Sequence, residues 1–205
     1  MTVQVFSYDS DLTGGSLQVR ECRVIADLLL RHASPEQWHD AIQQQNLLQK
    51  RSPASARRVA QALRKRLERL DEPFWRAIRD GDDELATQVA FCTALERNLL
   101  LVEFIETVLA DAFITRAETL EPWQWSDFLD DCSHRDPAIG NWTESSRKKM
   151  GQVVFRMLAE AGLLRSTRSM KLQPLLVRPE VRTLLDDSHR QRIKACLEVS
   201  GAAVQ

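Results

Sequence analysis

Lysine and arginine are concentrated in two segments of this 205-residue chain. Residues 50–70 hold eight Lys/Arg and one Glu, and residues 141–175 hold seven Lys/Arg and two Glu. Clustered cations attract polyanions, because contacts with phosphates release condensed counterions. Residues 71–140, between the clusters, hold sixteen Asp/Glu and five Arg, so the formal net charge of −1 is a cancellation. We therefore expect these two basic islands, residues 50–70 and 141–175, to contact a polyanion.

Two helices are predicted to position the first basic island. Ser34-Pro35 and Ser52-Pro53 are helix-start signals, opening a short helix to about Gln45 and a longer one to about Leu70. A short helix, a turn and a helix with a basic outer face resemble a helix-turn-helix. The residues expected on that outer face to contact DNA are Arg57, Arg58, Gln61, Arg64 and Lys65.

The second basic island is predicted to form a helix followed by a β-hairpin. Thr143 is a helix cap and Gly162 a helix end, and a polar turn at 166–169 follows between alternating residues. A helix, a loop, a basic helix and a hairpin follow the order of a winged helix, whose helix fits the major groove. The expected helix contacts are Ser145, Ser146, Arg147, Lys148, Lys149, Gln152 and Arg156, with the two serines binding phosphate at the helix N-terminus. The expected wing contacts are Arg165, Arg168 and Lys171.

Apolar residues recur at helical spacing through most of the chain, which predicts a mainly α fold. We expect two helices within 83–117, one over 126–132 and a single last helix over 179–199. Glu121-Pro122 predicts a domain boundary. The expected domains are residues 1–121, helical with a helix-turn-helix-like basic helix, and residues 122–205, winged-helix-like with one small β-hairpin.

The sequence gives no indication of enzymatic chemistry. The four histidines are scattered, and no nucleophile elbow, P-loop or dinucleotide-binding motif is present. The four cysteines stand far apart, which disfavours zinc and favours buried, reduced thiols. We therefore expect no catalytic residue, no metal and no cofactor. The tryptophans at helix starts or breaks are expected to wedge elements together: Trp75, Trp123, Trp125 and Trp142.

No membrane association or export is expected. Residues 86–114 are the most apolar stretch, but five charged side chains interrupt it. The first fifteen residues lack the basic and apolar regions of a signal peptide. These features predict a cytoplasmic protein.

Four stretches of the chain resemble the BrxA family of BREX bacteriophage-exclusion systems. They are the opening Tyr8…Leu12-Thr13-Gly14-Gly15…Leu17…Glu21 followed by Ile25-Ala26-Asp27-Leu28-Leu29, the central Ala94-Leu95-Glu96-Arg97-Asn98-Leu99-Leu100, the late Trp142…Ser145-Ser146…Lys149…Leu158-Ala159-Glu160-Ala161-Gly162-Leu163-Leu164, and the expected hairpin with Pro174 followed by Arg178-Pro179-Glu180-Val181. The resemblance covers nearly the whole chain in matching order. It implies a non-enzymatic, helical DNA-binding component of a multi-gene defence locus that also encodes a methyltransferase and an ATPase.

The leading hypothesis is a double-stranded DNA-binding accessory protein of limited sequence specificity, with other BREX proteins as further partners. One alternative is an RNA-binding, antitermination-like factor. Another is a protein-interaction scaffold whose acidic 71–140 segment contacts basic partners.

Overall fold

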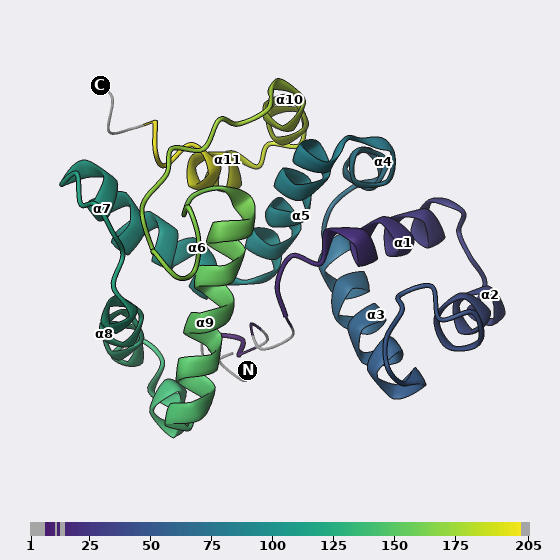
Figure 1. The fold of residues 1–205 in the computed structure, drawn as a ribbon, viewed down its shortest axis with the longest axis horizontal. Coiled ribbons are helices and arrows are strands. Elements are labelled where there is room, and N and C mark those ends of the chain that lie inside the picture. Colours follow the sequence, from purple (N-terminus) through teal and green to yellow (C-terminus); the bar gives the residue numbers. More distant parts are fainter. Residues whose placement is uncertain (1–6, 11, 13–14, 202–205) are drawn as a thin grey trace, which may run out of the picture. The chain divides into compact units, whose positions relative to one another are not determined.

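The computed structural model describes residues 7–10, 12 and 15–201, and helices dominate them (Figure 1). The predicted mainly α fold is confirmed. The helices are α1 (Val19–Leu30), α2 (Pro35–His39), α3 (Pro53–Leu67), α4 (Glu72–Asp80), α5 (Asp83–Arg97), α6 (Leu99–Phe104), α7 (Ala110–Ile114), α8 (Pro122–Ser133), α9 (Glu144–Ala161), α10 (Pro179–Asp187) and α11 (Gln191–Leu197), with π-helical turns η2 (Asp40–Gln44) and η3 (Ile105–Leu109) and the 3-10 turn η4 (Pro137–Asn141).

The chain divides into two compact units, each built from separated stretches. Unit 1 contains the described residues of Met1–Ser16, Asn98–Leu176 and Lys194–Gln205, and unit 2 contains Leu17–Arg97 and Val177–Ile193. The expected boundary between residues 121 and 122 does not coincide with this division. Leu120 is fully buried and its N–H donates to the carbonyl of Met170 (2.9 Å), so the chain on both sides of the expected boundary belongs to unit 1.

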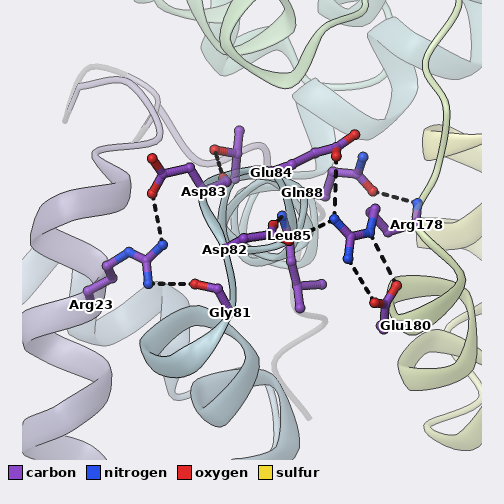
Figure 2. A network of polar contacts seen from close by, with 10 residues as sticks. Arg23, Gly81, Asp82, Asp83, Glu84, Leu85, Gln88, Arg178 and Glu180 are labelled. Atoms are coloured by element: carbon purple, nitrogen blue, oxygen red, sulfur yellow. Dashed lines mark hydrogen bonds and ion pairs between the residues drawn. The ribbon is translucent and has the colours of Figure 1, made fainter.

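In unit 2 the amphipathic helices α1, α3 and α4 pack together with α5, which is buried on most of its sides. Residues 177–193 return to this unit through Arg178. Its guanidinium bonds Asp82 (2.9 Å) and Glu84 (3.4 Å) at the start of α5, and also Glu180 (2.8 Å) at the start of α10 (Figure 2). The N–H of Arg178 donates to Gln88 (2.9 Å), which fixes the segment entering α10. These contacts explain why the C-terminal residues do not all belong to one unit.

In unit 1 an aromatic cluster joins α6, α8 and α9. The rings of Trp125, Phe128 and Phe155 each pack against Phe104, with centroids 5.3, 5.4 and 6.0 Å from it. Edge-to-face packing of this kind adds to the gain from apolar burial. The close approach of α8 and α9 depends on Gly151, where an added Cβ would lie 2.6 Å from the Trp125 ring.

Two helix boundaries differ from the prediction for local reasons. Helix α8 begins at Pro122 rather than at Ser126, because Glu121 and Gln124 form a reciprocal capping box with an N–H···O distance of 2.7 Å. The single helix expected over 179–199 is instead α10 and α11. The chain breaks at His189, which has a φ of 56° that helical residues do not adopt. Of the two helices expected within 83–117, the first is α5 and the second is divided into α6, η3 and α7; they meet at Asn98, whose side chain caps α6.

The predicted β-hairpin over residues 163–173, here called the 163–173 loop, is not formed as a pair of strands. Leu164 makes one isolated bridge with Leu172, and Thr119 makes another with Lys171. Met170 has a φ of 51°, which interrupts extended backbone at the point where the second strand was expected. The returning chain therefore bonds to a segment on each side of it rather than extending one ladder.

In the described part of the chain, no helix is long and apolar enough to cross a bilayer. The stretch over 86–114 is broken at Asn98, and most of its apolar residues are buried in α5, α6 and η3, whereas Ile114 in α7 is exposed.

Candidate nucleic-acid interface

Helix α9 carries most of the second basic island, and local signals define both of its ends. The hydroxyl of Thr143 accepts the N–H of Ser146 (3.2 Å) at the start, and Gly162 ends the helix with a φ of 91°. Met150, Val154 and Met157 lie on the buried side. The predicted extent of this helix, from a Thr143 cap to a Gly162 end, is confirmed.

The opposite side of α9 presents cations to solvent. Lys148, Lys149, Gln152 and Arg156 are all exposed. Across the described residues, the three charged members of this set have no ion-pair partner. Their ammonium and guanidinium groups are therefore available to an external anion.

The first turn of α9 is less available than its sequence indicates. Arg147 is half-buried, forms an ion pair with Asp130 of α8 and donates to the Ser126 carbonyl (3.4 Å). The Ser146 N–H is already bonded to the cap, and Glu144 adds a negative charge. Ser145 is exposed, and its hydroxyl lies 3.0 Å from that of Thr143. Arg147 is thus paired within unit 1, although it also lines a groove between α8 and α9, and few amides at this helix start are free for a phosphate.

The 163–173 loop holds three more exposed cations: Arg165, Arg168 and Lys171. The N–H of Arg165 donates to the carbonyl of Lys171 (2.9 Å) and closes the neck of the loop. At the tip, the Ser169 N–H donates to the Ser166 hydroxyl (3.1 Å). Arg168 is therefore presented from an ordered turn rather than from a loose one.

A groove of about 980 Å³ lies between the start of α8, the exposed side of α9 and the tip of the 163–173 loop. Lys148, Gln152, Arg156 and Arg168 line it together. The structure thus brings helix and loop residues of the second island into one site. Acidic side chains share its walls, so the groove is not uniformly positive: Glu121, Asp130 and Glu144.

The first basic island lies on α3 in unit 2. The predicted contact residues Arg57, Arg58, Gln61, Arg64 and Lys65 are all exposed, as the helical phasing predicted. The preceding element, α2 with η2, starts with a Ser34–Gln37 capping box and packs against α3.

Some cations of α3 are engaged within unit 2. Arg57 donates to Gln43 (2.8 Å), and Arg64 pairs with Glu68 (2.6 Å) while lying 4.6 Å from the centre of the Trp38 ring. For Arg58 and Lys65, the described residues supply no such partner. The first island therefore offers fewer unpaired cations among its predicted contacts than α9 and its loop.

The family model for BrxA matches residues 7–189 of this chain. The chain belongs to the BrxA family. This was the family indicated by the sequence resemblance, and the match covers both basic islands.

Named members of the BrxA family match over most of their length. A BREX protein BrxA of Paramagnetospirillum magneticum (strain ATCC 700264 / AMB-1) is 34% identical over 193 residues, covering 94% of this chain and 97% of the relative. A BREX protein BrxA of Escherichia coli O9:H4 (strain HS) is 32% identical over 188 residues, covering 92% of this chain and 88% of the relative. A crystal structure of an uncharacterized protein from Magnetospirillum magneticum has a TM-score of 0.85 and 32% identity, covering 94% of this chain and 99% of that one.

Two side chains of this BrxA-family chain have surroundings that its sequence did not reveal. Arg66, in the first basic island, is buried on the apolar side of α3. Trp123 was expected to wedge elements together, as Trp125 does, but 60% of it is exposed. Its position directly after Pro122, in the first turn of a helix rather than inside one, is the signal that could have separated it from Trp125.

The buried ionisable groups serve packing. The Tyr8 hydroxyl donates to Glu103 (2.7 Å), which also accepts from Arg135 (2.5 Å), so Tyr8 is held against α6. Burial raises the pKa of the Tyr8 phenol well above its ordinary value. All four cysteines are buried thiols outside any disulfide, as predicted, and burial raises the pKa of the Cys22 thiol to about 12. Within the described residues, no three His, Cys, Asp or Glu side chains are grouped to hold a metal ion.

Proposed function

We propose that this chain is a double-stranded DNA-binding accessory protein of a BREX phage-defence system, with no catalytic role of its own. The observation that carries the proposal is the set of unpaired cations on α9 and the 163–173 loop. Lys148, Arg156 and Arg168 line one groove, and Lys149 lies beside them on α9. Ordered cations on adjoining elements are suited to following a phosphate backbone.

The arrangement of elements in unit 1 supports the interpretation of α8 and α9 as a helix-turn-helix. Helix α8 precedes α9 and packs against it, and the 163–173 loop follows α9. Lys171 and Leu172 bridge to residues on either side, Thr119 before α8 and Leu164 after α9. We propose that α9 is the recognition helix and that the 163–173 loop takes the place of the wing of a winged helix. In a helix-turn-helix, the helix before the recognition helix crosses the DNA backbone.

Limited sequence specificity follows from the side chains that α9 presents. Lysine and arginine contacts to phosphates position a protein without reading sequence, whereas amides form paired hydrogen bonds to adenine edges. Gln152 is the one side-chain amide among the predicted contacts on this helix. We propose that α3 contributes a further phosphate contact through Arg58 and Lys65.

A binding measurement with a short labelled duplex tests this proposal. Lys148→Glu combined with Lys149→Glu should weaken binding at low salt by about tenfold or more, because two phosphate contacts become repulsions. Arg20→Glu combined with Arg116→Glu changes the net charge equally at exposed sites outside both predicted interfaces, and should weaken it much less.

Absent binding at low salt, or equal losses in the two double variants, would contradict the proposal. Competition with structured RNA distinguishes duplex DNA binding from the RNA-binding alternative. A recognition helix fits the wide major groove of B-DNA and not the deep, narrow major groove of A-form RNA. Stronger competition by RNA than by duplex DNA would therefore favour the RNA-binding alternative.

A further inference from the structure

Trp123 is a large aromatic side chain left in solvent at the rim of the α8–α9 groove. It is 60% exposed, whereas Trp125, two residues later in the same helix, is 2% exposed. Trp123 lies between Glu121 and Gln124, the two residues of the capping box, in the first turn of α8. The backbone that carries the indole is therefore ordered before any ligand binds.

The groove that Trp123 lines also carries the side chains that a nucleotide needs. Lys148, Arg156 and Arg168 supply positive charge for phosphate, and Gln152 and Thr167 supply neutral hydrogen-bonding groups. An exposed indole offers a flat face on which any base can stack. The volume of about 980 Å³ is at the upper end of the range for ligand pockets, which is large enough for a nucleotide.

The opposite side of Trp123 would repel the same ligand. A second groove of about 390 Å³, which Trp123 also lines, carries the carboxylates of Asp111, Asp127 and Asp131. Arg135 is the one cation in that lining, whereas the groove beside α9 has four cations against three carboxylates, so a nucleic-acid strand reaching the indole is favoured on the α9 side.

We infer that the α8–α9 groove holds an unpaired base stacked on Trp123, so that the protein prefers duplex DNA with a single-stranded extension to blunt duplex. The inference rests on the proposed function, because it places the duplex on α9. If the start of α8 lies at the DNA backbone, Trp123 cannot reach bases that are paired inside the duplex. An unpaired base can rotate outward and stack on the indole. Trp123 then acts in recognition of the single-stranded part alone.

The test compares a blunt duplex with the same duplex carrying a single-stranded extension on either strand. The wild-type protein should bind an extended duplex more tightly, by about fivefold to a hundredfold, which corresponds to one stacked base. Trp123→Ala should remove that preference and leave blunt-duplex affinity unchanged. Trp123→Phe should retain most of it, because the aromatic face remains. Thermal unfolding should show that both variants fold like the wild type, since the side chain is largely exposed.

Each outcome separates this inference from the proposed function. Blunt-duplex binding with no preference for either extension overturns the inference and leaves the proposed function standing. Loss of blunt-duplex binding in Trp123→Ala also overturns it, because the indole would then contact paired DNA. A Trp123→Ala variant that keeps the wild-type preference overturns it as well, and leaves the indole to a protein partner. Failure of the wild type to bind any duplex contradicts the proposed function itself.

Discussion

At the scale of single residues, the candidate interface depends on a contact behind it. The indole N–H of Trp125 donates to the carbonyl of Arg147 (2.9 Å), and its ring lies against the Cα of Gly151. The backbone of α9 can approach α8 this closely only because residue 151 has no Cβ. The outward direction of Lys148 and Gln152 thus depends on a glycine and a tryptophan that would touch no DNA.

Gly151→Ala should therefore destabilise the fold although alanine is the better helix former. The new Cβ would meet the Trp125 ring at 2.6 Å, and the clash should outweigh the gain in helix propensity, for a net loss of about 1–2 kcal/mol. Urea unfolding measures this loss. Gly140→Ala is the matched control, because nothing lies within 4 Å of a Cβ added there. Equal stability of the two variants would contradict this account of the α8–α9 contact.

At the scale of elements, the helices whose starts depend on local capping residues begin where the sequence predicted. The caps at Ser34, Ser52 and Thr143 act within three residues, so the starts of α2, α3 and α9 could be predicted. Elements that depend on distant partners could not. The N–H of Leu172 donates to the carbonyl of Glu118 (3.0 Å), a segment that precedes α8, so the returning chain is held by a distant partner as well as by Leu163 and Arg165.

The candidate contacts divide in the same way. A rotation of 100° per residue was enough to predict that Lys148, Gln152 and Arg156 are exposed. It could not show that Arg147 is paired, because its partner Asp130 belongs to another helix. Nor could it show that Trp123 is largely exposed, since burial depends on the elements around it.

The attachment of α10 to α5 should depend on pH in a predictable direction. The Leu85 N–H and then the Arg178 guanidinium lower the pKa of Asp82, and Arg178 first of all lowers the pKa of Glu180. Carboxyl groups whose pKa is lower in the folded protein stabilise it above their ordinary values of 3.8 and 4.5, and this stabilisation is lost as pH falls below them.

Arg178→Gln should therefore flatten the loss of stability on acidification only in part, since the Leu85 N–H still bonds Asp82. Urea midpoints measured from neutral pH down to about pH 3 test this expectation. Arg116→Gln, at an exposed position outside the network, is the control. An acid profile of Arg178→Gln that parallels the wild-type profile would exclude this network as a source of the pH dependence.

At the scale of the whole molecule, charge distribution carries the functional argument and net charge does not. The formal charge of −1 combines two basic islands with an acidic middle segment. The structure refines this picture, because Arg57, Arg64 and Arg147 are engaged within the protein while Lys148, Lys149 and Arg156 are not. Few free cations in an otherwise neutral chain limit the number of phosphate contacts, so DNA binding should be weak and its salt dependence modest.

The salt dependence of duplex binding tests this account most directly. Each phosphate contact contributes about −0.9 to the slope of log Kobs against log salt concentration. Lys148→Gln combined with Lys149→Gln should therefore make the wild-type slope shallower by about two. Arg20→Gln combined with Arg116→Gln should leave it unchanged. A flat wild-type slope, or equal slopes for all three proteins, would contradict the assignment of α9 as the DNA-contacting helix.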